Sequence, residues 1–214
     1  MTDAAVPIPA DAYHLAQAEA GHGADTNTGV SNAKLAIWLF LSSEALFFGA
    51  FISTYFLYRG RDAEFRGGIK PDDVFNIPFT SVTSFILLMS SLTMVLALAA
   101  IQRGDHRRLR IWLLATCLFG LTFVGGQVFE FTEFYREGLK LGTNMFGTTF
   151  FVLTGLHGAH VTMGIIWLLI LYGRSMQNRL PSERSEAVEI AGLYWHFVDI
   201  VWILIFTLVY LIPD

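Results

Sequence analysis

The sequence predicts an all-α, polytopic membrane protein: a bundle of five transmembrane helices preceded by a disordered-looking N-terminal tail. Of its 214 residues, 54% are hydrophobic and 15% are charged, a balance that departs from that of soluble domains. Five apolar segments each reach the roughly 20 residues that a helix needs to cross the hydrocarbon core. None of them shows the short alternating pattern of a membrane β-barrel, so helices are the structure that satisfies their backbone in lipid.

The chain divides by composition into a polar tail and a membrane domain. Residues 1–32 are rich in Ala, Gly, Asp and Thr and have no sustained hydrophobic period, which is typical of a mobile tail. The membrane domain is expected over residues 33–214. Its spans are predicted at about 33–58, 78–101, 109–134, 144–172 and 188–212, with aromatic residues near several of their ends.

The basic residues predict how the spans are oriented. An odd number of spans places the two termini on opposite sides of the membrane. The loops at 102–110 and 173–187 share a side with the N-terminus, and they are the more densely basic ones. The N-terminus is therefore predicted to be cytoplasmic and the C-terminus outside. The net charge of −4 is small and no basic face is visible, so no nucleic-acid partner is expected.

Glu44 is an ionisable residue in the middle of the first predicted span, which carries no other charge after Lys34. A charged side chain at this depth costs a few kcal/mol, so it normally faces a bundle interior or a polar cavity. Burial disfavours the charged form of a carboxyl, and such a group can hold or pass a proton. Alternatively, a protonated carboxyl could hydrogen-bond a neighbouring helix and serve assembly only. The residues by themselves leave both hypotheses open.

Seven further polar residues lie in or beside the last three spans. They are Gln127, Glu130, His157, His160, Glu189, His196 and Asp199. A spacing of three places His157 with His160, and Gln127 with Glu130, on one face of their helices. Together with Glu44, these groups are expected to converge in a buried polar network, or in a lipid-headgroup and proton site near an interface.

Metal binding is the competing interpretation of the three intramembrane histidines. His157, His160 and His196 could ligate haem, copper or a di-iron pair. A di-iron bundle is usually marked by Glu-x-x-His repeats, and the residues three positions before these histidines are Thr154, His157 and Leu193. Haem ligation by His160 and His196 stays open. The residues thus leave three classes: a membrane oxidoreductase, an accessory subunit and a transporter, although the internal repeats of many transporters are not found.

Three stretches carry a family resemblance. They are WLFLSSEALFFGAF (38–51), FFVLTGLHGAHVTMG (150–164) and YWHFVDIVW (194–202). In order and separation they resemble motifs of subunit III of the haem-copper respiratory oxidases, and the similarity extends from about Ala33 to Pro213. Many members of that family have seven helices, whereas this chain resembles the five-helix bacterial form.

The resemblance implies a non-redox subunit of a proton-pumping terminal oxidase in the bacterial plasma membrane. Such a subunit stabilises catalytic subunit I, binds phospholipid and supports proton uptake. It would be part of an oxidoreductase and translocase complex without being catalytic itself. The chain would hold no cofactor of its own beyond structural phospholipid, because subunit I carries the haem and copper. The implied partners are subunit I, subunit II, a small subunit in place of the missing first two helices, and membrane lipids.

The resemblance also implies site residues. Glu44 falls on the family's intramembrane glutamate, associated with the proton side. Four residues match positions that line the polar and lipid-contacting region: His160, Arg174, Glu189 and His196. His157 and Asp199 lie within the matched motifs. A glutamate in the SSE of the first motif looks more like cytochrome c oxidases than quinol oxidases, and a quinol oxidase remains the alternative.

Overall fold

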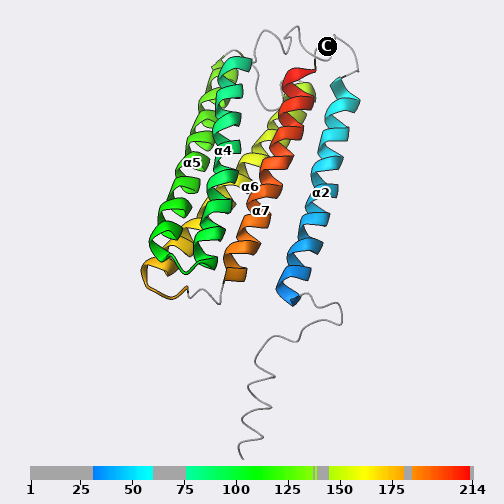
Figure 1. Cartoon of the computed structure of the whole chain (residues 1–214). Coiled ribbons are helices and arrows are strands. Elements are labelled where there is room, and N and C mark those ends of the chain that lie inside the picture. Colours follow the sequence, from blue (N-terminus) through cyan, green and yellow to red (C-terminus); the bar gives the residue numbers. More distant parts are fainter. Residues whose placement is uncertain (1–30, 60–75, 137, 139–144, 181–184, 213–214) are drawn as a thin grey trace, which may run out of the picture. The chain divides into compact units, whose positions relative to one another are not determined.

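The computed structural model describes residues 31–59, 76–136, 138, 145–180 and 185–212 (Figure 1). These residues form five long helices and one short π-helical segment. The helices are α2 (Asn32–Arg59), α4 (Ile77–Gln102), α5 (His106–Arg136), α6 (Met145–Met176) and α7 (Ser185–Ile205), and α7 continues into η3 (Phe206–Leu211). All five are long and apolar enough to cross a membrane. The predicted fold class is therefore confirmed.

Contacts along the chain divide it into two units, Met1–Phe40 and Leu41–Asp214. In the first unit the structure describes residues 31–40, the start of α2. Ser31 accepts a hydrogen bond from the backbone N–H of Lys34 on its Oγ at 3.2 Å, which satisfies one of the free N–H groups of the first turn. The rest of the predicted tail lies outside the described residues.

Within the second unit, four helices follow one another around a closed ring. α4 packs against α5, α5 against α6, α6 against α7, and α7 returns to α4 (Figure 1). Short connections favour this order. The α4–α5 turn uses Gly104 at a φ of +73°, and Asp105 then caps α5 by accepting the N–H of Arg108 at 3.0 Å.

The ring closes around two tryptophans of α7. Trp195 lies between two glycines: a Cβ would lie 2.7 Å from its ring at Gly120 of α5, and 2.9 Å at Gly164 of α6. Its indole N–H donates to Ser90 of α4 at 2.9 Å. Small residues let these helices approach closely, which replaces the hydrophobic driving force that is missing between helices in lipid.

Trp202, two turns further along α7, repeats the arrangement. Its indole N–H donates to Ser84 of α4 at 2.8 Å, and the whole residue is 2% exposed. A buried indole needs such a partner, because an unsatisfied donor has no water to bond in the bundle interior. Two serines of α4 therefore hold α7 in place through its tryptophans.

Candidate functional site

Glu44 of α2 and His160 of α6 form a polar pair. The carboxylate Oε2 lies 3.2 Å from the imidazole Nε2, and the side chains are 18% and 15% exposed. Glu44 thus contacts another helix of the second unit, while the pair keeps an opening to the surroundings of the chain.

The second ring nitrogen of His160 identifies what the pair can hold. Its Nδ1 lies 2.7 Å from the carbonyl oxygen of Leu156, which can only accept, so Nδ1 carries a hydrogen and donates. A neutral ring with this tautomer has a bare Nε2, which requires a protonated Glu44 as its donor. A cationic ring donates from Nε2 to a charged Glu44 instead. In both forms one proton lies between Glu44 and His160.

Aromatic rings enclose the pair on its inner side. Phe48, one turn after Glu44 on α2, is 2% exposed, and its ring centre lies 5.0 Å from that of His160. On α7, the Tyr194 hydroxyl donates to the backbone carbonyl of His160 at 2.9 Å. The pair is therefore positioned from two sides and is separated from the bundle core.

His157 lies one turn from His160 but in different surroundings. It is fully buried, its ring is stacked on Trp202 at 4.9 Å, and Phe123 meets it edge-on at 5.9 Å. Neither ring nitrogen has a hydrogen-bond partner in the described part of the chain. His157 therefore packs as an aromatic ring and does not extend the polar pair by hydrogen bonds.

A second polar cluster joins α4 to α7. The Ser91 hydroxyl contacts the Asp199 carboxylate and lies 3.0 Å from Nδ1 of His196. Since a carboxylate only accepts, Ser91 donates to Asp199 and can accept from His196. The other carboxylate oxygen of Asp199 is buried with no partner among the described residues. Sequence reasoning missed Ser91, which the run of serines in the second span could have suggested.

Gln127 and Glu130 face different neighbours although they share one face of α5. The Gln127 amide donates to the carbonyl of Thr154 on α6 at 2.7 Å, whereas the Glu130 carboxylate accepts from Thr80 on α4. A Cβ at Gly158 would overlap the Gln127 amide oxygen, so this close contact needs a glycine.

The expected single network is therefore wrong for the hydrogen bonds that the described residues make. These bonds instead form separate links between helix pairs, because each side chain bonds the neighbour directly opposite it. Arg174 is exposed in the last turn of α6, and Glu189 is half-buried in the second turn of α7.

The ligand set of the metal hypothesis is not brought together. In the described ranges, no three His, Cys, Asp or Glu side chains lie close enough to share a metal ion. His196 is bonded toward Ser91 on the α4 side of α7, while His160 pairs with α2.

The order of helices, the buried pair and the two tryptophan contacts describe a membrane bundle whose relatives can be compared directly. A family model described as cytochrome c oxidase subunit III matches residues 13–213. The chain belongs to this family. The resemblance stated from the three motifs is thereby confirmed.

Curated relatives agree with the family and include both kinds of electron donor. Quinol oxidase subunit 3 of Bacillus spizizenii is 40% identical over 83% of this chain and 85% of its own length. Cytochrome c oxidase subunit 3 of Bacillus sp. strain PS3 is 36% identical over 84% and 86%. Cytochrome bo(3) ubiquinol oxidase subunit 3 of Pseudomonas aeruginosa is 35% identical over 92% and 94%. As a member of the subunit III family, the chain is a subunit of a haem-copper oxidase.

Proposed function

We propose that this subunit III stabilises the haem- and copper-bearing subunit I of a proton-pumping terminal oxidase, binds phospholipid and supports proton uptake through Glu44. It holds no redox centre and performs no chemistry on the oxidase substrates. Subunit I, subunit II and a small subunit in place of two missing helices are its partners. The complex lies in a bacterial plasma membrane, with the N-terminus of this chain in the cytoplasm.

The Glu44–His160 pair is the observation that supports this role. It shares one proton between two side chains, it lies 3.2 Å apart, and each side chain is partly exposed. Exposure matters because a fully enclosed pair could not exchange its proton with a neighbouring subunit. Next to it on α2, Leu46 is 78% exposed, so this part of the helix presents an apolar surface outward.

A Glu44→Gln variant of the assembled oxidase tests the proposal. Gln keeps the size of the side chain and removes the exchangeable proton, so haem content should be unchanged. The number of protons pumped per electron, or the lifetime of the enzyme in turnover, should fall. Glu133→Gln is the matched control, because Glu133 is a half-exposed carboxylate near the end of α5 that pairs with Arg136 at 3.7 Å. Unchanged pumping and lifetime in Glu44→Gln would reduce Glu44 to a packing residue.

The electron donor has two candidates, each with one supporting observation. Glu44 in the SSE motif favours a cytochrome c oxidase, whereas the 40% identity to the Bacillus spizizenii protein favours a quinol oxidase. Affinity purification of the tagged chain, followed by identification of subunit II and oxygen-uptake assays with reduced cytochrome c and with a quinol, separates them. Uptake with the quinol alone would reject the cytochrome c assignment.

A further inference from the structure

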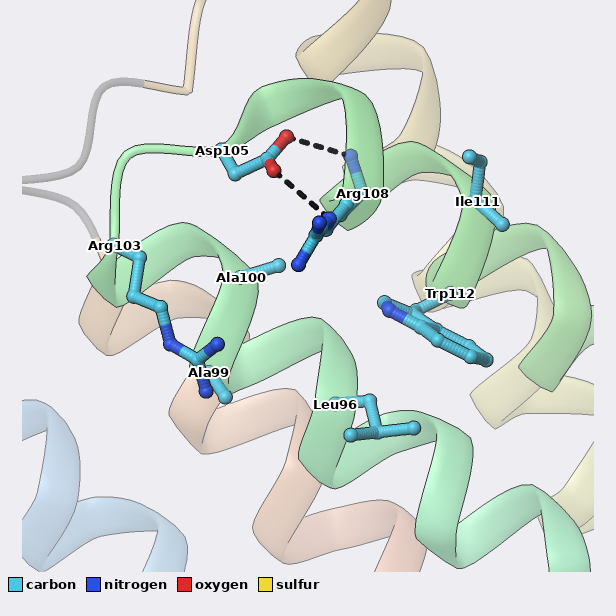
Figure 2. A pocket seen from close by; sticks show the side chains of 8 residues that line it. All are labelled: Leu96, Ala99, Ala100, Arg103, Asp105, Arg108, Ile111 and Trp112. Carbon is cyan, nitrogen blue, oxygen red and sulfur yellow. Dashed lines mark hydrogen bonds and ion pairs between the residues drawn. The ribbon is translucent and has the colours of Figure 1, made fainter.

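A cavity of about 560 Å³ lies where α4 ends and α5 begins (Figure 2). It is lined by Leu96, Ala99, Ala100, Arg103, Asp105, Arg108, Ile111 and Trp112. None of these residues belongs to the Glu44–His160 pair or to the Ser91 cluster, so the cavity is a separate feature of the chain.

One end of the cavity is cationic. Arg103 follows the last turn of α4, and its side chain extends along the cavity wall beside Ala99 (Figure 2). Arg103 makes no side-chain hydrogen bond or ion pair within the described residues. Arg108 reaches the cavity from the first turn of α5, with its Nε 3.2 Å from Asp105 Oδ2. Two guanidinium groups therefore face one carboxylate, which leaves a net positive charge.

The other end is apolar. Leu96 lies two turns before Arg103, and Ile111, which is 54% exposed, extends the wall toward the membrane-facing surface. Trp112 stands between the two ends, with an indole N–H that has no bond in the described part of the chain. Tryptophan prefers the boundary between headgroups and acyl chains, where its apolar ring and its polar N–H are both accommodated.

We propose that this cavity binds an anionic phospholipid, with its phosphate between Arg103 and Arg108 and an acyl chain along Leu96 and Ile111. Guanidinium groups match phosphate oxygens in geometry and charge. A soluble anion would use the cationic end but would leave the apolar wall without a partner. Basic clusters at the cytoplasmic face also attract anionic lipids, and the proposed orientation puts this loop there.

The inference rests on the proposed lipid-binding role and gives it a place in the chain. It does not involve proton uptake. Bound lipid is counted without turnover, so the result for Glu44→Gln and the result here can fail separately.

The test uses the assembled oxidase in vesicles of phosphatidylcholine containing a minor fraction of phosphatidylglycerol. After mild detergent extraction, native mass spectrometry counts the phosphatidylglycerol retained by each complex. An Arg103→Ala/Arg108→Ala variant should retain several-fold less at this chain. Arg107→Ala is the matched control, because Arg107 is an exposed arginine of the same loop that does not line the cavity. Its retention should equal that of the wild type.

Asp105→Asn provides the opposite change. Asn caps a helix as well as Asp, so the start of α5 is kept while the competing carboxylate is removed. This variant should retain more phosphatidylglycerol than the wild type. It also decides the matter when the double variant fails to assemble, since unchanged retention in Asp105→Asn would overturn the proposal.

Two further outcomes would contradict the proposal. Equal loss in Arg107→Ala and in the double variant would mean diffuse attraction to a basic loop and no built site. Displacement of the retained lipid by millimolar-range inorganic phosphate, with phosphate bound in its place, would assign the cavity to a soluble anion. Retention that resists phosphate and falls only in the double variant supports a phospholipid.

Discussion

Two helix contacts of this subunit III use polar residues in different ways. Around Trp195 and Trp202 the α4–α7 contact is buried and closely packed, and each indole is paired with a serine. The α2–α6 contact at Glu44 and His160 is partly exposed and holds a proton. In lipid, helices associate through close packing and hydrogen bonds. The first contact therefore accounts for assembly, which leaves the second available for function.

The largest expected effect comes from filling the space beside Trp195. Gly120→Ala places a Cβ 2.7 Å from its ring, so the indole must shift or the helices must separate. Overpacking of this kind costs about 1–3 kcal/mol. Thermal unfolding of the purified oxidase in detergent should show a clear loss of subunit III stability.

Gly125→Ala is the control on the same helix. Nothing lies within 4 Å of a Cβ at that position, so the variant should be neutral or gain the helix propensity of alanine, up to about 1 kcal/mol. An equal loss in both variants would mean that close packing against Trp195 is not what holds α5 and α7 together.

A comparable or smaller effect is expected at the serine that receives Trp202. Ser84→Ala leaves the buried indole N–H without a partner, at a cost of about 1–3 kcal/mol. Ser81→Ala removes a hydroxyl of the same helix that bonds only the Ile77 carbonyl, and it should change stability little. The midpoints of thermal unfolding distinguish them, and equal shifts would show that the indole bond contributes nothing.

The sequence predicted the helices well because the signal is local. Length and hydropathy are read along one segment, and the predicted span 78–101 differs from Ile77–Gln102 by one residue at each end. The glycines were predicted to mark packed seams, which is right for Gly120 and Gly164 and wrong for Gly125. Composition identifies small residues, but the face that meets a neighbour is decided by the packing of the whole bundle.

The polar site was harder to predict for the same reason. Gln127 and Glu130 share a helix face, yet one bonds α6 and the other α4, since a groove on α5 separates two neighbours. Ser84 and Ser91 went unnoticed because a serine in an apolar span usually bonds its own helix. Only the spatial position of Trp202 and Asp199 reveals their second role.

The smallest expected effect is the coupling between Glu44 and His160. A double-mutant cycle with Glu44→Ala, His160→Ala and both together cancels the packing lost against Phe48 and isolates the pair. Interhelical hydrogen bonds in membranes average about 0.6 kcal/mol in such cycles, and partial exposure keeps this one near that value. Thermal stability of the oxidase is again the measurement.

The size of this coupling decides whether the two contacts really differ. A coupling as large as the cost of Ser84→Ala would make the pair a structural link like the tryptophan contacts, and a change in pumping could then follow from loosened helices. A small coupling together with altered pumping in Glu44→Gln separates the two roles. The proton between Oε2 and Nε2 would then matter because it can leave, and the bonds at Trp195 and Trp202 because they stay.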